Sequence, residues 1–262
     1  MTAEPTAVII GVSPYLTTPA PRRKYVSAGG ARAPFLGPIM LLRRLVLAVL
    51  AILPVASAAG QERNINYDLL VAGRNGNTAL VGALIDRGAK PDSRDRNGDT
   101  PLNLAARRGD LGLATLLLQR GATPDLPNLA GVTPLMSAAY NGHDEVMGLL
   151  LENGAVPGLT DQLDKTAMVY AAGTGHPECV GALLDAGVDV NTRYRHQLTA
   201  LMWAAASGSL PTVELLLQRG ADVGARDDRG KTALDIAKDE RAAEIVRRLS
   251  AGSGDQGAST GP

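Results

Sequence analysis

The sequence predicts an all-α solenoid of helix–turn–helix units that are joined by short β-hairpin or turn fingers. Threonine recurs every 33 residues, at Thr100, Thr133, Thr166, Thr199 and Thr232, each time directly before an alanine-containing segment. Glycines follow these segments with the same spacing. A fixed period of about 20 to 50 residues is typical of repeat proteins, in which each unit buries its apolar face against its neighbours.

Each unit carries start and stop signals for two short helices. The threonine hydroxyl is placed to accept a hydrogen bond from a backbone N–H at the helix start, and Pro101 suits the first helical position. Gly109 and Gly121 follow the first and the second helix of one unit, because glycine tolerates the left-handed conformation that closes a helix. An Asp or Asn such as Asp95 opens a turn before most of the threonines.

The one tryptophan of the chain, Trp203, fits the same periodic pattern. It occupies the slot held in other units by Leu104, Ser137, Tyr170 and Ile236. Large apolar residues at a periodic position are most often interior. We therefore predict that Trp203 packs in the core or is partly buried, and that it is not the floor of a small-molecule site.

The units resemble ankyrin repeats, whose signature reads D-x-x-G-x-T-P-L-H-x-A-A-x-x-G-H, followed by a second helix and G-A-D-x-N. The resemblance covers about Asn64 to Leu249 and implies a repeat domain over residues 62–249. The expected repeats are a degenerate cap at 64–94, four repeats at 95–127, 128–160, 161–193 and 194–226, and a C-terminal cap at 227–249.

The chain departs from this signature at the histidine that follows the leucine. Its slot holds Asn103, Met136, Val169, Met202 and Asp235. We expect the usual hydrogen bonds of the family histidine to be lost, and the first-helix surface of the middle repeats to become more apolar.

Residues 40–59 have the three-part layout of a secretory signal peptide. Arg43 and Arg44 precede an apolar run over 45–55, and small residues ending at Ala58 fit a cleavage site. The run is shorter than the roughly 20 apolar residues that cross a bilayer. We expect a periplasmic or secreted protein of a Gram-negative bacterium, and the alternative is an uncleaved anchor in the inner membrane.

The segments that flank the repeats lack their periodicity. Residues 1–39 are rich in Pro, Ala and Gly and predict a disordered leader, with Met40 as a candidate start of translation. Residues 250–262 are rich in Gly and Ser and predict a disordered tail.

Composition and motifs exclude several kinds of function. Beyond residue 58 the chain carries 20 bases and 25 acids, and this mildly acidic balance argues against a nucleic-acid partner. The sequence GSGDQG at 252–257 matches a dinucleotide pattern without the strand and helix that the pattern requires. Histidines one repeat apart, His143 and His176, are too far from each other to bind one metal ion. We therefore assign no cofactor and no metal.

A thiol-dependent enzyme is the remaining catalytic alternative. His176 and Cys179 lie three residues apart at a helix start, but the sequence shows no third group to orient the histidine. Because Cys179 is the only cysteine, an internal disulfide is excluded. The expected function is therefore non-enzymatic.

By resemblance, ankyrin repeats bind protein partners through their turn tips and the face of their first helices. The candidate residues on the turns are Arg96, Asn97, Asp99, Leu129, Val132, Gln162, Leu163, Lys165, Arg195, His196 and Leu198. The candidates on the first helices are Asn103, Arg107, Arg108, Met136, Tyr140, Asn141, Val169, Thr174 and Met202. We expect the apolar members of both sets to form one exposed strip, as interaction sites often do. Replacing Met136 and Met202 by Asp is then expected to abolish partner capture with little change in the melting curve.

Overall fold

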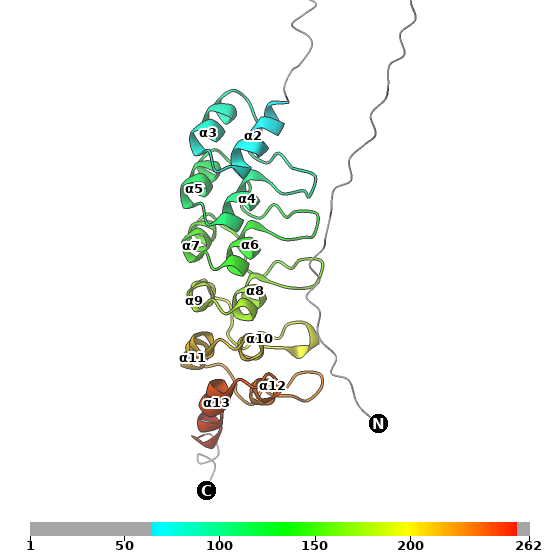
Figure 1. Cartoon of the computed structure of the whole chain (residues 1–262), viewed down its shortest axis with the longest axis vertical. Helices are drawn as coiled ribbons and strands as arrows, with labels where there is room; N and C mark the ends of the chain where they lie inside the picture. The colour runs from blue at the N-terminus through cyan, green and yellow to red at the C-terminus, as the bar shows by residue number, and fades with distance from the viewer. Residues whose placement is uncertain (1–63, 256–262) are drawn as a thin grey trace, which may run out of the picture. The chain divides into compact units, whose positions relative to one another are not determined.

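The computed structural model describes residues 64–255, which form a stack of paired antiparallel helices (Figure 1). The predicted leader at 1–39 and the signal segment at 40–59 lie outside these residues. The first helices of the pairs are α2 (Ile65–Arg74), α4 (Pro101–Arg108), α6 (Pro134–Asn141), α8 (Ala167–Thr174), α10 (Ala200–Ser207) and α12 (Ala233–Asp239). The second helices are α3 (Thr78–Asp86), α5 (Leu111–Gln119), α7 (Asp144–Glu152), α9 (Pro177–Asp185), α11 (Leu210–Gln218) and α13 (Ala243–Asp255).

The two sets of helices form two rows, and turns project beside the first helices, away from the second helices (Figure 1). We call these turns the fingers; they comprise residues 95–99, 128–132, 161–165, 194–198 and 227–231. Residues 64–255 contain no strand: four fingers take the turn form of the prediction, and the finger 194–198 contains a short 3-10 helix, η1 (Arg195–Gln197). The predicted all-α stack of two-helix repeats is confirmed.

The recurring threonines cap the first helices as predicted. Each hydroxyl accepts a hydrogen bond from the backbone N–H three residues later, as Thr133 does from Met136 at 3.3 Å and Thr166 from Val169 at 3.4 Å. Gly142 then ends α6 with φ at +76°, in the left-handed region. These bonds satisfy backbone groups that a helix end otherwise leaves without a partner.

The expected loss of the family histidine's hydrogen bonds is wrong in two repeats. The Asn103 side-chain oxygen accepts from the backbone N–H of Thr100 at 2.9 Å, and the Asp235 carboxylate accepts from that of Thr232 at 3.1 Å. Both pairs form capping boxes. A short polar side chain at the third helical position reaches back to the helix cap, so it replaces the histidine there.

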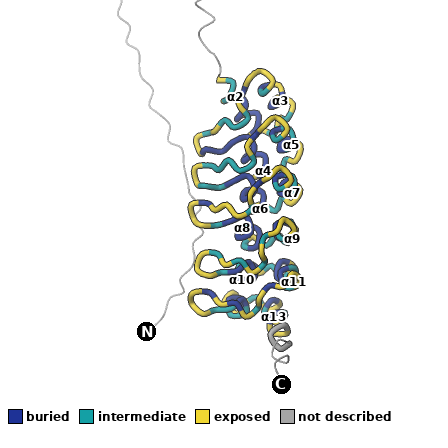
Figure 2. The backbone as a smooth tube through the Cα atoms, turned by 180° about the vertical axis from the view of Figure 1, so that it is seen from behind, coloured by how far each residue is buried: buried dark blue, intermediate teal, exposed yellow. Residues whose placement is uncertain are grey.

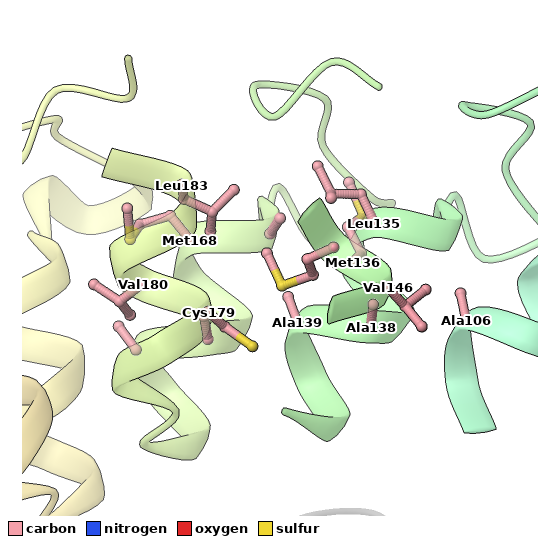
Figure 3. Packing of buried hydrophobic residues seen from close by; sticks show 14 of the residues in the cluster. Ala106, Leu135, Met136, Ala138, Ala139, Val146, Met168, Cys179, Val180 and Leu183 are labelled. Carbon is pink, nitrogen blue, oxygen red and sulfur yellow. The ribbon is translucent and has the colours of Figure 1, made fainter. Parts of the chain in front are cut away.

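The apolar core runs through the whole stack, between and within the helix pairs (Figure 2). Alanine pairs such as Ala138 and Ala139 are fully buried and let neighbouring first helices approach closely. Larger side chains from both rows fill the remaining space, as around Met136, Met168 and Val180 (Figure 3). Because each pair has little core of its own, stability depends on the contacts between repeats.

The two ends of the stack differ from the sequence prediction. The helix α2 begins two residues before the threonine slot occupied by Tyr67, and Asn64 caps it by accepting from the backbone N–H of Asn66 at 3.1 Å. At the other end α13 continues to Asp255, past the predicted domain boundary at 249. Once a helix is nucleated, adding a turn costs little, so the helix extends beyond the buried Leu249.

Candidate functional site

The finger tips are held in shape by their first residue. In four fingers this residue is Asp or Asn, and its side-chain oxygen accepts from the backbone N–H groups two and four residues later. The carboxylate of Asp161, for example, accepts from Leu163 at 2.8 Å and from Lys165 at 2.9 Å. The finger 194–198 begins instead with Tyr194, which cannot make these bonds.

The first residue of the finger 227–231 shows a perturbed pKa. Burial alone would raise the pKa of Asp227, but hydrogen bonds from the Arg229 side chain and from the backbone N–H groups of Lys231 and Arg229 lower it below its ordinary value. Hydrogen bonds from the Thr232 backbone and hydroxyl lower the pKa of Asp235 in the same way. Both carboxylates therefore stabilise the last repeat in their charged form.

Neighbouring fingers are joined by one backbone hydrogen bond at most junctions. The N–H of Leu129 donates to Asn97 at 2.9 Å, that of Gln162 to Ala130 at 3.1 Å, and that of Asp228 to His196 at 3.1 Å. The equivalent bond would run from the Arg195 N–H to the Leu163 carbonyl, and it is absent. Among the described residues, an ion pair between Arg195 and Asp164, at 3.8 Å, joins the two fingers at this junction.

Most of the predicted site residues lie at the surface. Exposed side chains on the fingers and first helices are Arg96, Asn97, Arg107, Arg108, Leu129, Tyr140, Asn141, Gln162, Leu163, Thr174, Arg195 and His196, and partly exposed ones are Val132, Lys165 and Leu198. Leu129, Leu163 and Tyr140 are the most exposed of the apolar ones, at 66%, 58% and 52%.

The predicted continuous apolar strip is wrong, because three of its four first-helix members are interior and only Tyr140 is exposed. Met136 and Met202 are each 1% exposed and Val169 is 3% exposed. They occupy the third helical position, and the Cα–Cβ bonds of a helix tilt toward its N-terminus. These side chains therefore lie close to the helix cap, where neighbouring repeats cover them. The expectation that Met136→Asp and Met202→Asp leave the melting curve unchanged is wrong for the same reason.

Two polar candidates are also buried and have structural partners. Asp99 is 2% exposed; its carboxylate accepts from Arg107 at 3.1 Å and from the side chain of Asn128 at 2.9 Å. Asn103 is 1% exposed and is engaged in the capping box described above. Asp99 and Asn103 thus hold finger and helix together and are not free to contact a partner.

Aromatic side chains from three repeats come together beside the fingers. The rings of Tyr140 and Tyr170 meet edge to face, with centroids 5.7 Å apart. The Lys165 ammonium lies 5.5 Å from the Tyr170 ring centroid and 5.8 Å from that of Trp203, within the range of cation–π attraction. We did not predict Tyr170 or Trp203 as site residues, although their shared periodic slot marks them as the two large aromatics of the first helices' middle turn.

The polar groups of Tyr170 and Trp203 differ in their hydrogen bonding. The Tyr170 hydroxyl donates to Asp161 at 2.5 Å; burial, and next the hydrogen bond and charge of Asp161, raise the pKa of Tyr170 above its ordinary value. Trp203 is partly buried and packs against the core, as predicted. Its indole N–H is buried and has no hydrogen-bond partner among the described residues.

A hollow of about 250 Å³ lies between the fingers 161–165 and 194–198. We call it the junction hollow. It is lined by Leu163, Asp164, Lys165, Val169, Tyr194, Arg195, His196, Leu198 and Trp203. A second hollow, of about 510 Å³, shares Asp164, Tyr194 and Arg195 with it and continues toward the loop that follows α9. Two adjoining hollows thus lie at the one finger junction that lacks a backbone hydrogen bond.

Comparison with known protein families identifies the repeats. A family model described as ankyrin repeats (3 copies) matches residues 69–161, 149–227 and 196–258. The chain belongs to the ankyrin repeat family.

Among solved structures, the crystal structure of EF0377, an ankyrin repeat protein, is similar to this chain. The two are 30% identical, and the match covers 70% of this chain and 96% of that chain with a TM-score of 0.63. A search of curated proteins finds no significant match. Ankyrin repeats generally act as protein-interaction scaffolds and are typically non-catalytic.

Cys179 and His176, the pair that a thiol-dependent enzyme would use, are packed against other residues of these ankyrin repeats. Cys179 is fully buried, and burial, followed by the nearby charges of Asp144 and Glu178, raises the pKa of its thiol to about 12. His176 packs against Gly142, whose added Cβ would lie 2.6 Å from its ring. Neither feature suits a reactive thiolate, which needs a lowered pKa and access to solvent.

Searches for metal and membrane features cover residues 64–255 only. No group of three or more His, Cys, Asp or Glu side chains in this range is placed to hold a metal ion. None of the helices described here is both long enough and apolar enough to span a membrane.

Proposed function

We propose that this ankyrin repeat chain is a non-enzymatic scaffold that binds a protein partner through its finger face. The finger face is the surface formed by the finger tips and the adjoining side of the first helices. The observation that carries the proposal is the exposure of Leu129, Leu163 and Tyr140, three large apolar side chains, on this face. Exposed aromatic and aliphatic side chains that gather on one surface mark interaction sites.

The placement of Tyr140 follows from its repeat position. Arg107 occupies the equivalent position one repeat earlier, and it forms an ion pair with Asp99 on the finger of its own repeat. Tyr140 therefore lies on the finger side of α6, where its ring contacts Tyr170. Because rigid aromatic side chains lose little conformational entropy on binding, they suit the centre of an interface.

Affinity capture from a periplasmic extract tests the scaffold. The double variant Leu129→Asp with Tyr140→Asp is expected to lose the captured protein and to keep the melting temperature within a few degrees, because both side chains are more than half exposed. The matched control is Leu80→Asp on α3, a second helix, where the leucine is 44% exposed. Capture that is equal for the wild-type chain and both variants would contradict a finger-face interface.

We also propose that the scaffold works in the periplasm or outside the cell. The support is the signal-like sequence at 40–59, which lies outside the described residues. Fractionation should place the protein with soluble periplasmic or secreted proteins, and N-terminal sequencing should find a start just after Ala58. A mature chain that is intact from Thr2 would refute cleavage, and a chain retained in the inner-membrane fraction would support the anchored alternative.

A further inference from the structure

We propose that the partner inserts an extended peptide segment at the junction hollow. An apolar side chain of this segment enters the hollow, and an adjacent carboxylate binds Lys165 and Arg195. This inference rests on the proposed scaffold function and narrows it to one finger junction and one chemistry.

The junction offers unpaired backbone groups to such a segment. At the other three junctions between these fingers, the corresponding carbonyl and N–H bond to each other. Among the described residues, the Leu163 carbonyl accepts no hydrogen bond and the Arg195 N–H donates none. An extended peptide that lies across an open backbone edge gains main-chain hydrogen bonds, while its side chains enter neighbouring hollows.

The finger 194–198 also carries backbone strain. His196 and Gln197 have φ values of +60° and +59°, in the left-handed region that favours glycine. Gly98, Gly131 and Gly230 occupy the position of Gln197 in three other fingers. A non-glycine residue in this region is strained, because its Cβ comes too close to the following carbonyl oxygen. Strain of this kind concentrates at functional sites, where the geometry has a use that offsets its cost.

The buried indole N–H of Trp203 adds a second unfavourable feature at the same place. An unpaired buried donor destabilises the fold, because it has lost its hydrogen bond to water and gained none from the protein. The strained finger, the absent inter-finger bond and this unpaired donor all involve the repeat 194–226, and all three border the junction hollow. Selection for stability alone does not explain why these three unfavourable features lie together at one junction.

The size and charge of the junction hollow indicate what it holds. Its volume, about 250 Å³, is below the roughly 300–1,000 Å³ of sites for drug-sized ligands, so it suits one amino-acid side chain. Its apolar walls come from Val169, Leu198 and Trp203. Lys165 forms no ion pair within the described part of the chain, and Arg195 has only the exposed Asp164 at 3.8 Å. Two cations beside one acid favour a carboxylate next to the inserted side chain.

Trp203 makes the site directly observable, because it is the only tryptophan in the chain. The experiment selects peptides from a random twelve-residue phage library on the full chain and then titrates synthetic versions of the enriched peptides. We expect the peptides to share one large apolar residue next to Asp or Glu. We also expect them to shift Trp203 fluorescence on binding. Replacing the apolar residue by Ser, or the acid by Lys, should weaken binding at least tenfold.

Charge reversal in the protein tests the same contacts. Arg195→Glu and Lys165→Glu should each weaken the peptides at least tenfold. Arg87→Glu is the matched control, since Arg87 is also an exposed arginine but lies at the end of α3, in the row of second helices. The inference is overturned by a library without enrichment, by peptides that leave Trp203 fluorescence unchanged, or by equal effects of all three variants.

The outcomes separate this inference from the scaffold proposal. If the Leu129 and Tyr140 double variant loses the protein partner while Arg195→Glu and Lys165→Glu keep it, the junction inference is wrong and the scaffold proposal stands. If the peptides bind as expected but no protein depends on Leu129 and Tyr140, the broader finger-face interface is wrong.

Discussion

Replacing Met136 by Ala tests whether the third helical position of the first helices belongs to the core. The Met136 side chain is 1% exposed and lies among the buried side chains between repeats (Figure 3). Truncating such a methionine removes its burial and leaves a cavity, which costs about 2–5 kcal/mol. For a folded domain of this size, about 3 kcal/mol lowers the melting temperature by about 6–12 °C.

Thermal and urea unfolding followed by far-UV circular dichroism measure this loss. Leu129→Ala is the control, because that leucine is 66% exposed and its truncation should change the free energy of unfolding by no more than about 0.5 kcal/mol. Met136→Asp should cost more than Met136→Ala, since it buries a carboxyl group without a partner. Equal, small effects of Met136→Ala and Leu129→Ala would show that Met136 is a surface residue and would restore the continuous apolar strip.

Three other predictions concern the titratable and glycine positions. Cys179, buried and with a thiol pKa of about 12, should react with a thiol reagent at neutral pH only after unfolding; rapid reaction of the native protein would revive the thiol enzyme. Folding lowers the pKa values of Asp227 and Asp235 from 3.8. Their contribution to stability is therefore complete above pH 3.8 and is lost as the pH falls further. Replacing both by Asn should flatten the acid side of a curve of stability against pH. Gly142→Ala should destabilise the fold by more than about 1 kcal/mol because of the positive φ of this residue. Adding His176→Ala should restore only the part of the lost stability that is due to contact between the new methyl group and the His176 ring. Full restoration would contradict the backbone explanation.

The repeat fold could be predicted from the sequence because its local signals are short-range. Thr133 and Gly142 mark the start and end of α6 through bonds to residues close in the chain, and the same signals recur in each repeat. The period then determines which units are neighbours. Boundaries at the two ends were less predictable, since α2 and α13 each have a repeat on one side only and their limits depend on local capping and helix extension.

The candidate site was harder to predict because exposure depends on the packing of neighbouring repeats. In the sequence, Met136 and Leu129 are both apolar, and both occupy positions at which ankyrin repeats are expected to contact a partner. In the structure, one is buried beneath its neighbours and the other projects into solvent. The periodic slot of Tyr170 and Trp203 carried a usable signal, since aromatics replaced smaller residues there in adjacent repeats. This periodic slot correctly indicated that Trp203 packs against the core. It did not indicate that Tyr170 and Trp203 form a cluster with Lys165.

The departures from the repeat pattern are informative because they gather in one place. Tyr194 replaces the Asp or Asn that shapes the other fingers, and His196 and Gln197 in the same finger adopt left-handed conformations without glycine. Each change alone lowers local stability. The other repeats of the chain carry, at the equivalent positions, residues that avoid this loss. Where a chain keeps locally unfavourable residues beside a hollow, function is a better explanation than folding. The junction between 161–165 and 194–198 is therefore where a mutational search for partner specificity should begin.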